Sequence, residues 1–244
     1  MLQKWDVFGI GYSSNLRLEL ARLWSADAPL DVLGYYLRTM LVLPPLDQYR
    51  KVALVAHSMG GLVVQHALLD EETRKRVSHA FLFATPSAGV VKASMLQRFN
   101  LQTQEMLTGS EFIANLRAGW PEAYAGGKAF ILRVIAGERD AFVPPDTSLL
   151  PFEDAVRFVV PGDHLSMVKP ESLDNPSVQI VVRGLLQQPP TAEAHGAPMA
   201  STVGATPAGK FWLLERQAAS AKRRRVLIGT VLIVVALALC VLLQ

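Results

Sequence analysis

A serine followed by two glycines, directly after a short apolar run, is the part of this sequence best suited to chemistry. The stretch VALVAHSMGGLVVQ, residues 52–65, has the pattern of a strand, a sharp turn and a helix. It matches the nucleophile elbow Gly-x-Ser-x-Gly, except that Ala56 stands in the place of the first glycine. Small residues are required there, because larger side chains would collide where the strand meets the helix. The pattern predicts that Ser58 is a nucleophile, exposed at the apex of the turn.

A serine hydroxyl is a poor nucleophile until a neighbouring base removes its proton. Around a nucleophile elbow, the partners follow along the chain in the order Ser, Asp or Glu, His. Asp140 and His164 come in this order, and each follows a run of residues typical of a strand. We therefore expect His164 to be the general base and Asp140 to fix its tautomer and stabilise the imidazolium.

Three other carboxylates could take the place of Asp140: Asp163, Asp146 and Glu138. Asp163 is adjacent to His164, and adjacent residues on a loop rarely point at each other. Asp146 lies further from the strand end, behind two prolines. Position at the strand end favours Asp140.

The remaining histidines are expected to be structural, since an isolated histidine is more often structural than catalytic. His57 lies within the turn itself and is a candidate for shaping the site. The others are His66, His79 and His195.

Short apolar runs alternate with amphipathic stretches along the first 186 residues. The strand-like runs are Trp5–Gly11, Val52–Ala56, Ala80–Ala84, Ala129–Ala136 and Val156–Val160. The helix-like stretches are Leu16–Ser25, Val32–Leu41, Leu62–Asp70 and a longer region from Val90 to Tyr124. This alternation predicts an α/β fold with a mostly parallel sheet and helices on both faces. Chemistry in such sheets gathers at the carboxyl ends of the strands, where Ser58, Asp140 and His164 are expected.

Four segments, in this order, resemble the lipase/esterase branch of the α/β-hydrolase superfamily: VALVAHSMGGLVVQ, FLFATPSAG, IAGERDAFVP and GDHLSMVKP. They are most similar to the phosphatidylinositol-deacylase-like and serine-active-site lipase-like groups, over residues 5–186. The resemblance implies a triad of Ser58, Asp140 and His164. It also implies an oxyanion donor at the backbone N–H of Met59, beside Gly60. An acyl-enzyme mechanism of this kind needs no metal and no organic cofactor.

The resemblance is incomplete before the elbow, where the family supplies a second oxyanion donor from a glycine-containing loop. Two interpretations of WDVFGIGYSSN, residues 5–15, are open. In one, this segment is that strand and loop, and Gly9 and Gly11 form the hole. In the other, which we favour, it is the next strand of the family, so the fold is incomplete at the N-terminus because the chain starts too late. The sheet would then have a gap with unpaired backbone groups, unless Trp5–Gly11 moves into it.

Charge and composition exclude several classes of protein. Residues 187–225 carry six basic and two acidic side chains, whereas residues 1–186 carry 18 basic and 19 acidic ones. The basic excess belongs to the tail, which argues against nucleic acid as a partner of the body. Apolar residues make up 50% of the chain and charged residues 18%, which excludes a disordered acidic or low-complexity protein. Cys240 is the only cysteine, so an intramolecular disulfide and a cysteine-based metal site are excluded.

The C-terminal part is expected to be a membrane anchor. Residues 226–243 contain no charge and no proline, and as a helix they would extend about 27 Å, close to the thickness of the hydrocarbon core. The four basic residues at 222–225 favour keeping that side in the cytoplasm. The sequence thus predicts a tail-anchored, single-pass protein with a cytoplasmic body. Its parts would be an α/β-hydrolase domain over 1–186, a flexible linker over 187–210, a basic juxtamembrane segment over 211–225 and a transmembrane helix over 226–243.

These features together predict a membrane-anchored serine hydrolase that cleaves a carboxylic ester, with a lipid or other acyl ester as substrate. The alternative is a catalytically inactive protein of the same fold that binds a partner or an acyl ligand at a membrane. The region Ser87–Gly127 is rich in aliphatic and aromatic residues, which fit a cap over the pocket and ordinary helical packing equally well.

Overall fold

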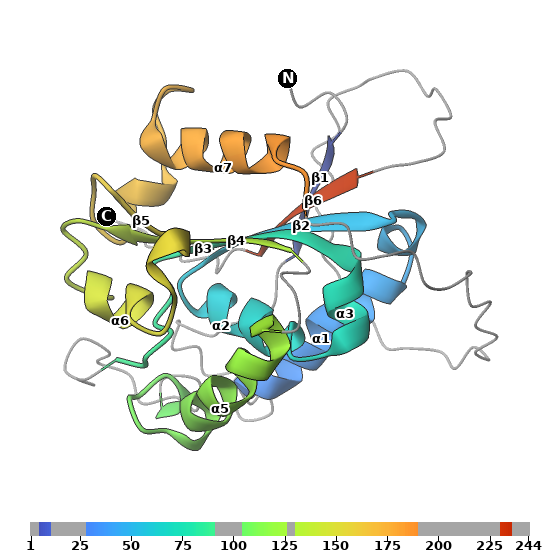
Figure 1. Ribbon diagram of the computed structural model, residues 1–244, viewed down its shortest axis with the longest axis horizontal. Helices are drawn as coiled ribbons and strands as arrows, with labels where there is room; N and C mark the ends of the chain where they lie inside the picture. Colours follow the sequence, from blue (N-terminus) through green and yellow to red (C-terminus); the bar gives the residue numbers. More distant parts are fainter. Residues whose placement is uncertain (1–4, 11–27, 91–103, 126–129, 190–229, 236–244) are drawn as a thin grey trace, which may run out of the picture.

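The computed structural model describes residues 5–10, 28–90, 104–125, 130–189 and 230–235. Six strands form one sheet with the order β1-β6-β2-β3-β4-β5, and every neighbouring pair is parallel. Figure 1 shows the sheet nearly edge-on, with helices on both of its faces. The strands are β1 (Trp5–Ile10), β2 (Lys51–His57), β3 (Val77–Phe83), β4 (Ile131–Gly137), β5 (Arg157–Val160) and β6 (Thr230–Val235). The mostly parallel sheet predicted from the sequence is therefore confirmed.

Alternating side chains of β2 divide between two hydrophobic cores. Val52, Leu54 and Ala56 belong to the larger core, whereas Ala53 and Val55 face the smaller one. This alternation follows from the two-residue period of a strand. A strand covered on both faces needs apolar residues at every position, which is why β2 reads as a continuous apolar run.

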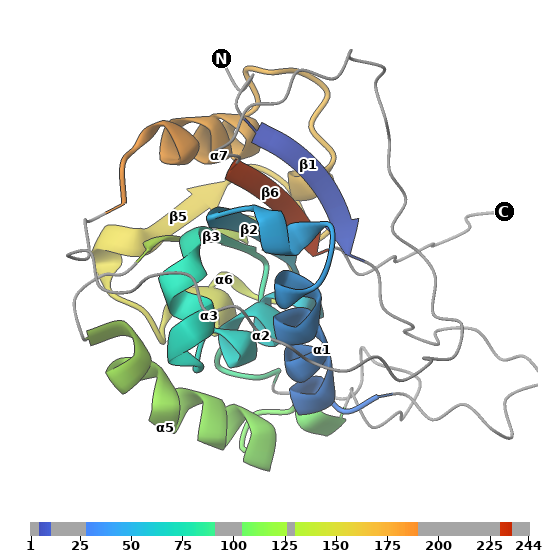
Figure 2. The same cartoon turned by 90° about the vertical axis from the view of Figure 1, so that its right-hand side faces the viewer.

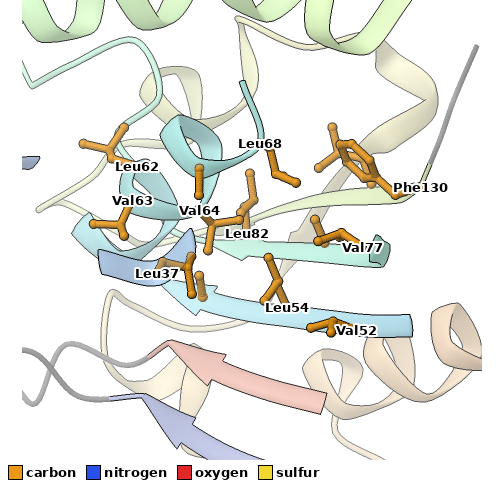
Figure 3. Packing of buried hydrophobic residues seen from close by; sticks show 14 of the residues in the cluster. Leu37, Val52, Leu54, Leu62, Val63, Val64, Leu68, Val77, Leu82 and Phe130 are labelled. Atoms are coloured by element: carbon orange, nitrogen blue, oxygen red, sulfur yellow. The ribbon is translucent and has the colours of Figure 1, made fainter. Parts of the chain in front are cut away.

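The larger core lies between the sheet and α1 (Leu30–Val42), α2 (Met59–Ala67) and α5 (Glu111–Ala125). Figure 3 shows Val64 of α2 and Leu37 of α1 packed over Leu54 and Leu82 of the sheet. Eight of the nine residues of α2 are buried, because this helix is enclosed by the sheet, α1 and α5. The short α3 (Glu71–Arg76) follows α2, and Asp70 caps it by accepting a hydrogen bond from the Thr73 N–H. The helix that carries the elbow is thus held on several sides.

The opposite face of the sheet is covered by α7 (Pro176–Leu186), as both orientations in Figures 1 and 2 show. Asn175 caps this helix by accepting from the Ser177 N–H, and Pro176 occupies its first position. A β-carbon on Gly184 would lie 2.6 Å from Phe81 Cε1, so a glycine is needed for α7 to approach β3 this closely. In the described parts of the chain, the other elements are α6 (Pro145–Leu149) and the 3₁₀ turns η2 (Leu46–Gln48), η4 (Asp154–Val156) and η5 (Ser166–Val168).

The sheet position between β1 and the elbow strand β2 is filled by β6. Thr230 pairs with Trp5 on one side and Lys51 on the other, and Val235 pairs with Ile10 and Ala56. Figure 2 shows β6 between β1 and β2. The sequence predicted either a gap at this place or a move of the N-terminal strand into it. Both expectations are wrong here, because the C-terminal segment supplies the missing strand.

This strand also corrects the prediction of a transmembrane helix over 226–243, since Thr230–Val235 is extended and paired on both sides. Across the described parts of the chain, no helix has the length and apolar character needed to cross a bilayer. A short apolar run rich in β-branched residues fits a strand buried in a parallel sheet as well as it fits an apolar helix. The open position beside β2 decides in favour of the strand, because it satisfies two ladders of backbone hydrogen bonds.

The predicted strands of the body agree with β1 to β5, and two predicted helices agree with α1 and α2. The predicted helix Leu16–Ser25 lies outside the described residues. The linker over 187–210 and the basic segment over 211–225 also lie outside them, apart from residues 187–189.

Candidate active site

The elbow at Ser58 has the strained backbone that a sharp strand-to-helix turn requires. Ser58 has φ 55° and ψ −131°, in a region that residues other than glycine rarely adopt. Such a conformation costs about 1–3 kcal/mol and persists only where the surroundings enforce it. Here the Ser58 N–H donates to the Phe83 carbonyl of β3 at 2.8 Å, and α2 begins at the next residue. The turn presents the serine at the carboxyl end of β2.

Gly61 lets the first turn of α2 approach the loop that follows β3. A β-carbon at this position would lie 1.8 Å from Thr85 Oγ1, and Thr85 is fully buried. Any side chain at position 61 would therefore force Thr85 or α2 to shift. This contact explains the steric requirement for a small residue after the serine.

Replacement of Gly61 by alanine is expected to lower the free energy of unfolding by about 1–3 kcal/mol, the usual effect of overpacking. Urea denaturation measures it. Gly119→Ala is the matched control, since its β-carbon would lie 3.2 Å from the flexible end of Leu69. Equal stability of the Gly61→Ala variant and the unmodified protein would contradict the close contact.

The structure brings together three side chains that are far apart in the sequence: Ser58, His164 and Asp140. Ser58 Oγ is 3.1 Å from His164 Nε2, and His164 Nδ1 is 2.8 Å from Asp140 Oδ2. Asp140 Oδ1 accepts from the backbone N–H groups of Phe142 and Val143 at 2.9 and 2.8 Å. The Asp140 side chain is fully buried, and that of His164 is 13% exposed. With one carboxylate oxygen on backbone donors and the other on the imidazole, the orientation of Asp140 is fixed.

The other carboxylates considered from the sequence are engaged elsewhere. Asp163 Oδ1 accepts from the backbone N–H groups of Leu165 and Ser166, and so orders the loop that carries His164. Glu138 lies 3.7 Å from the exposed guanidinium of Arg139, and Asp146 is exposed in the first turn of α6.

His164 is enclosed by two rings. The centroid of His57 lies 4.6 Å from that of His164, and the centroid of Phe142 lies 4.8 Å from it. His57 Nε2 is 2.8 Å from the backbone carbonyl oxygen of His164. Burial, followed by the nearby His164, lowers the pKa of His57 from 6.5 to about 4. His57 is therefore neutral at physiological pH.

Of the oxyanion donors predicted from the sequence, Met59 and Gly60 lie beside Ser58, whereas Gly9 lies two strands away. Met59 is the first residue of α2 and Gly60 the second, so their N–H groups belong to the first turn, where helical N–H groups lack intrahelical acceptors. Gly9 lies in β1 in register with Val55, two strand spacings or about 10 Å from β2. The structure thus does not bring Gly9 to Ser58, because β6 lies between them. Gly11 lies outside the described residues.

The histidines expected to be structural pack away from this site. His66 of α2 contacts the rings of Tyr35 and Phe112. His79 of β3 hydrogen-bonds Ser78 and the Gln187 carbonyl on the α7 side of the sheet. His195 lies outside the described residues.

The described part of the region expected to be a cap packs as ordinary core. Ile113, Leu116 and Trp120 of α5 are buried against α2 in the larger core. Met95, Leu96 and Phe99 lie outside the described residues.

A comparison with known protein families gives a match over the region that contains Ser58. Residues 45–149, which include β2, Ser58, α2 and Asp140, match the family described as serine hydrolase. Over these residues the chain is similar to that family. Ser58, Asp140 and His164 follow the carboxyl ends of β2, β4 and β5, respectively.

Solved structures with a similar fold include the phospholipase PlaB from Legionella pneumophila in complex with thio-NAD. It has a TM-score of 0.55 and 13% identity, over 66% of this chain and 48% of that protein. Lipase B from Aspergillus fumigatus has a TM-score of 0.42 and 20% identity, over 57% of this chain and 35% of the lipase. The chain thus spans about half the length of the phospholipase and about a third of that of the lipase. A comparison with curated proteins gave no significant match.

Proposed function

We propose that this α/β-hydrolase is a serine ester hydrolase with a triad of Ser58, His164 and Asp140. The observation that supports the proposal is the chain of contacts from Ser58 Oγ through the imidazole of His164 to the carboxylate of Asp140. With its Nδ1–H donating to Asp140, the neutral imidazole presents the lone pair of Nε2 to the serine hydroxyl. This is the tautomer that a general base needs.

In the proposed reaction, His164 takes the proton of Ser58 while Oγ forms a bond to the ester carbonyl carbon. The backbone N–H of Met59 stabilises the negative charge on the former carbonyl oxygen. When the bond to the alcohol oxygen breaks, His164 returns the proton to that oxygen, and the acyl group stays on Ser58. Water then attacks the acyl-enzyme with the same base, which releases the carboxylic acid and restores the serine.

Acyl esters are the proposed substrates, and lipid esters are the first to test. Phospholipase PlaB shares the fold and is named as a phospholipase, which makes a phospholipid a reasonable member of the test set. Short and long p-nitrophenyl esters together with a phospholipid would reveal the preferred acyl length.

Labelling with a fluorophosphonate probe tests whether Ser58 is an activated nucleophile. We expect the full chain to be labelled and Ser58→Ala to be unlabelled, because the probe reacts with serines that a base activates. Ser87→Ala is the matched control, since Ser87 is a buried serine that hydrogen-bonds Gln65 rather than a histidine. Absence of labelling of the folded wild-type chain would contradict the proposed function.

The second candidate is a catalytically inactive protein that keeps the fold and binds an acyl ligand or a partner. The position of Gly9 favours it, because β6 separates this glycine from the elbow. Loss of one oxyanion donor reduces turnover by about 10²–10³-fold. An unlabelled but folded chain that binds fatty acid would support this alternative.

We propose membrane association of this chain on the basic residues 222–225 alone. A segment that pairs in the sheet as β6 cannot span a bilayer as a helix in the same molecule. The stability of the chain after deletion of this segment distinguishes the two arrangements.

A further inference from the structure

His57 is the last residue of β2 and immediately precedes Ser58. Its ring does not point to the serine hydroxyl. Instead, Nε2 lies 2.8 Å from the backbone oxygen of His164, a residue 107 positions further along the chain. The two imidazole rings are also in contact, with centroids 4.6 Å apart.

The direction of this hydrogen bond follows from its partner. A carbonyl oxygen only accepts, so His57 must carry its proton on Nε2 and donate it. The pKa of about 4 caused by burial keeps the ring neutral near pH 7, which leaves a single proton for this bond. A neutral donor suits a position beside His164, because a charged His57 would oppose the imidazolium that His164 forms during catalysis.

Other hydrogen bonds also hold the loop that contains His164, but they involve the residues before and after His164. The Arg139 N–H donates to the Gly162 carbonyl at 3.0 Å, and Asp163 accepts from Leu165 and Ser166. At His164 itself, Asp140 binds the ring and His57 binds the backbone. The ring and the backbone of the base are thus held by different residues.

We propose that His57 is a positioning residue that sets the distance between the nucleophile and the base by binding the backbone of His164. Three residues close a ring of contacts. A peptide bond joins His57 to Ser58, a hydrogen bond joins His57 to the backbone of His164, and His164 Nε2 lies within hydrogen-bond distance of Ser58 Oγ. Because His57 and Ser58 belong to one rigid turn, a shift of the base relative to the nucleophile requires this bond to break. The inference rests on the proposed function of the triad.

Two substitutions at position 57 separate positioning from packing. His57→Leu fills the space with an apolar side chain but has no donor, whereas His57→Gln places an amide N–H near the position of Nε2. We expect His57→Leu to lower turnover of a p-nitrophenyl ester and the rate of fluorophosphonate labelling by about 10–100-fold, the effect of a displacement of about 1 Å. His57→Gln should recover most of both rates. Rates are expressed per active site, counted after complete labelling.

His66→Leu is the matched control, since His66 lies on α2 and contacts Tyr35 and Phe112 but none of the triad. Its turnover should equal that of the wild type. Equal rates for His57→Leu and the wild type would overturn the inference, as would a folded His57→Gln variant as slow as His57→Leu. If the wild type itself neither labels nor hydrolyses ester, the proposed function fails instead.

A measurement on the unmodified protein tests the same bond without mutation or turnover. Nitrogen-15 NMR of the imidazole rings distinguishes the two neutral tautomers of histidine. We expect His57 in the Nε2–H form at pH 7. The Nδ1–H form would overturn the inference, because it leaves no proton for the His164 carbonyl.

Discussion

Deletion of residues 230–244 is expected to abolish the cooperative unfolding transition of this chain or to lower its midpoint by more than about 10 °C. The deletion removes β6, the only strand that pairs with β1 among the described residues, and exposes the backbone of β2 along Lys51–Ala56. Each lost hydrogen bond costs about 0.5–1.5 kcal/mol, and a domain is stable by only about 5–15 kcal/mol. Loss of two ladders therefore removes most of the stability. Differential scanning calorimetry of the full chain and the deletion variant measures the effect.

A point substitution tests the pairing of β6 without shortening the chain. Leu232 pairs with Val7 of β1 and Ala53 of β2 at the middle of β6. Leu232→Pro removes one backbone donor from the interior of the sheet, whereas Leu232→Ile leaves the backbone unchanged. Deletion of residues 236–244 alone keeps β6 and is the second control. Unchanged melting after loss of residues 230–244 would contradict the strand and would restore the prediction of a membrane helix.

Replacement of Asp140 by asparagine is expected to lower ester turnover by about 10³–10⁴-fold with little loss of stability. The backbone N–H groups of Phe142 and Val143 require an acceptor, so the amide oxygen must take the position of Oδ1. The amide NH₂ then faces His164 Nδ1, which must become an acceptor. The imidazole proton moves to Nε2, and His164 can no longer accept the proton of Ser58.

Asp146→Asn is the control for this substitution, since Asp146 is an exposed carboxylate of the neighbouring α6. Its turnover should match that of the wild type. The two variants are compared by kcat/KM for a p-nitrophenyl ester and by melting temperature. A folded Asp140→Asn variant with turnover within about tenfold of the wild type, a difference of only about 1.4 kcal/mol, would remove Asp140 from the proposed triad.

The positions of Ser58, Asp140 and His164 could be predicted because each is indicated by the residues immediately around it. Val52–Ala56 is a continuous apolar run, and Ser58 follows it between small residues, so strand, turn and helix are all indicated within a few positions. Asp140 and His164 could be found because parallel strands end at a common edge, and both residues directly follow strands. The structure brings these side chains within hydrogen-bond distance of one another.

The pairing of Thr230–Val235 could not be predicted in the same way. Its composition fits both a buried strand and an apolar helix, and the choice depends on an open sheet position formed by residues far away in the chain. The position of Gly9 could not be predicted for the same reason, because its distance from Ser58 depends on whether a strand lies between β1 and β2. The sequence indicated that His57 is a candidate for shaping the site, but its partner could not be predicted, because that partner is a backbone atom 107 residues away.

Among the described strands, β6 is the last to be synthesised. All the other described strands precede it in the sequence, so the ribosome completes β1 and β2 long before their common neighbour emerges. Until then, β1 and β2 each present a row of unpaired backbone groups, which invites pairing with strands of other nascent chains. We expect chaperones to be needed during this interval. The strand that precedes Ser58 gains its second neighbour only after all the other described strands have been synthesised.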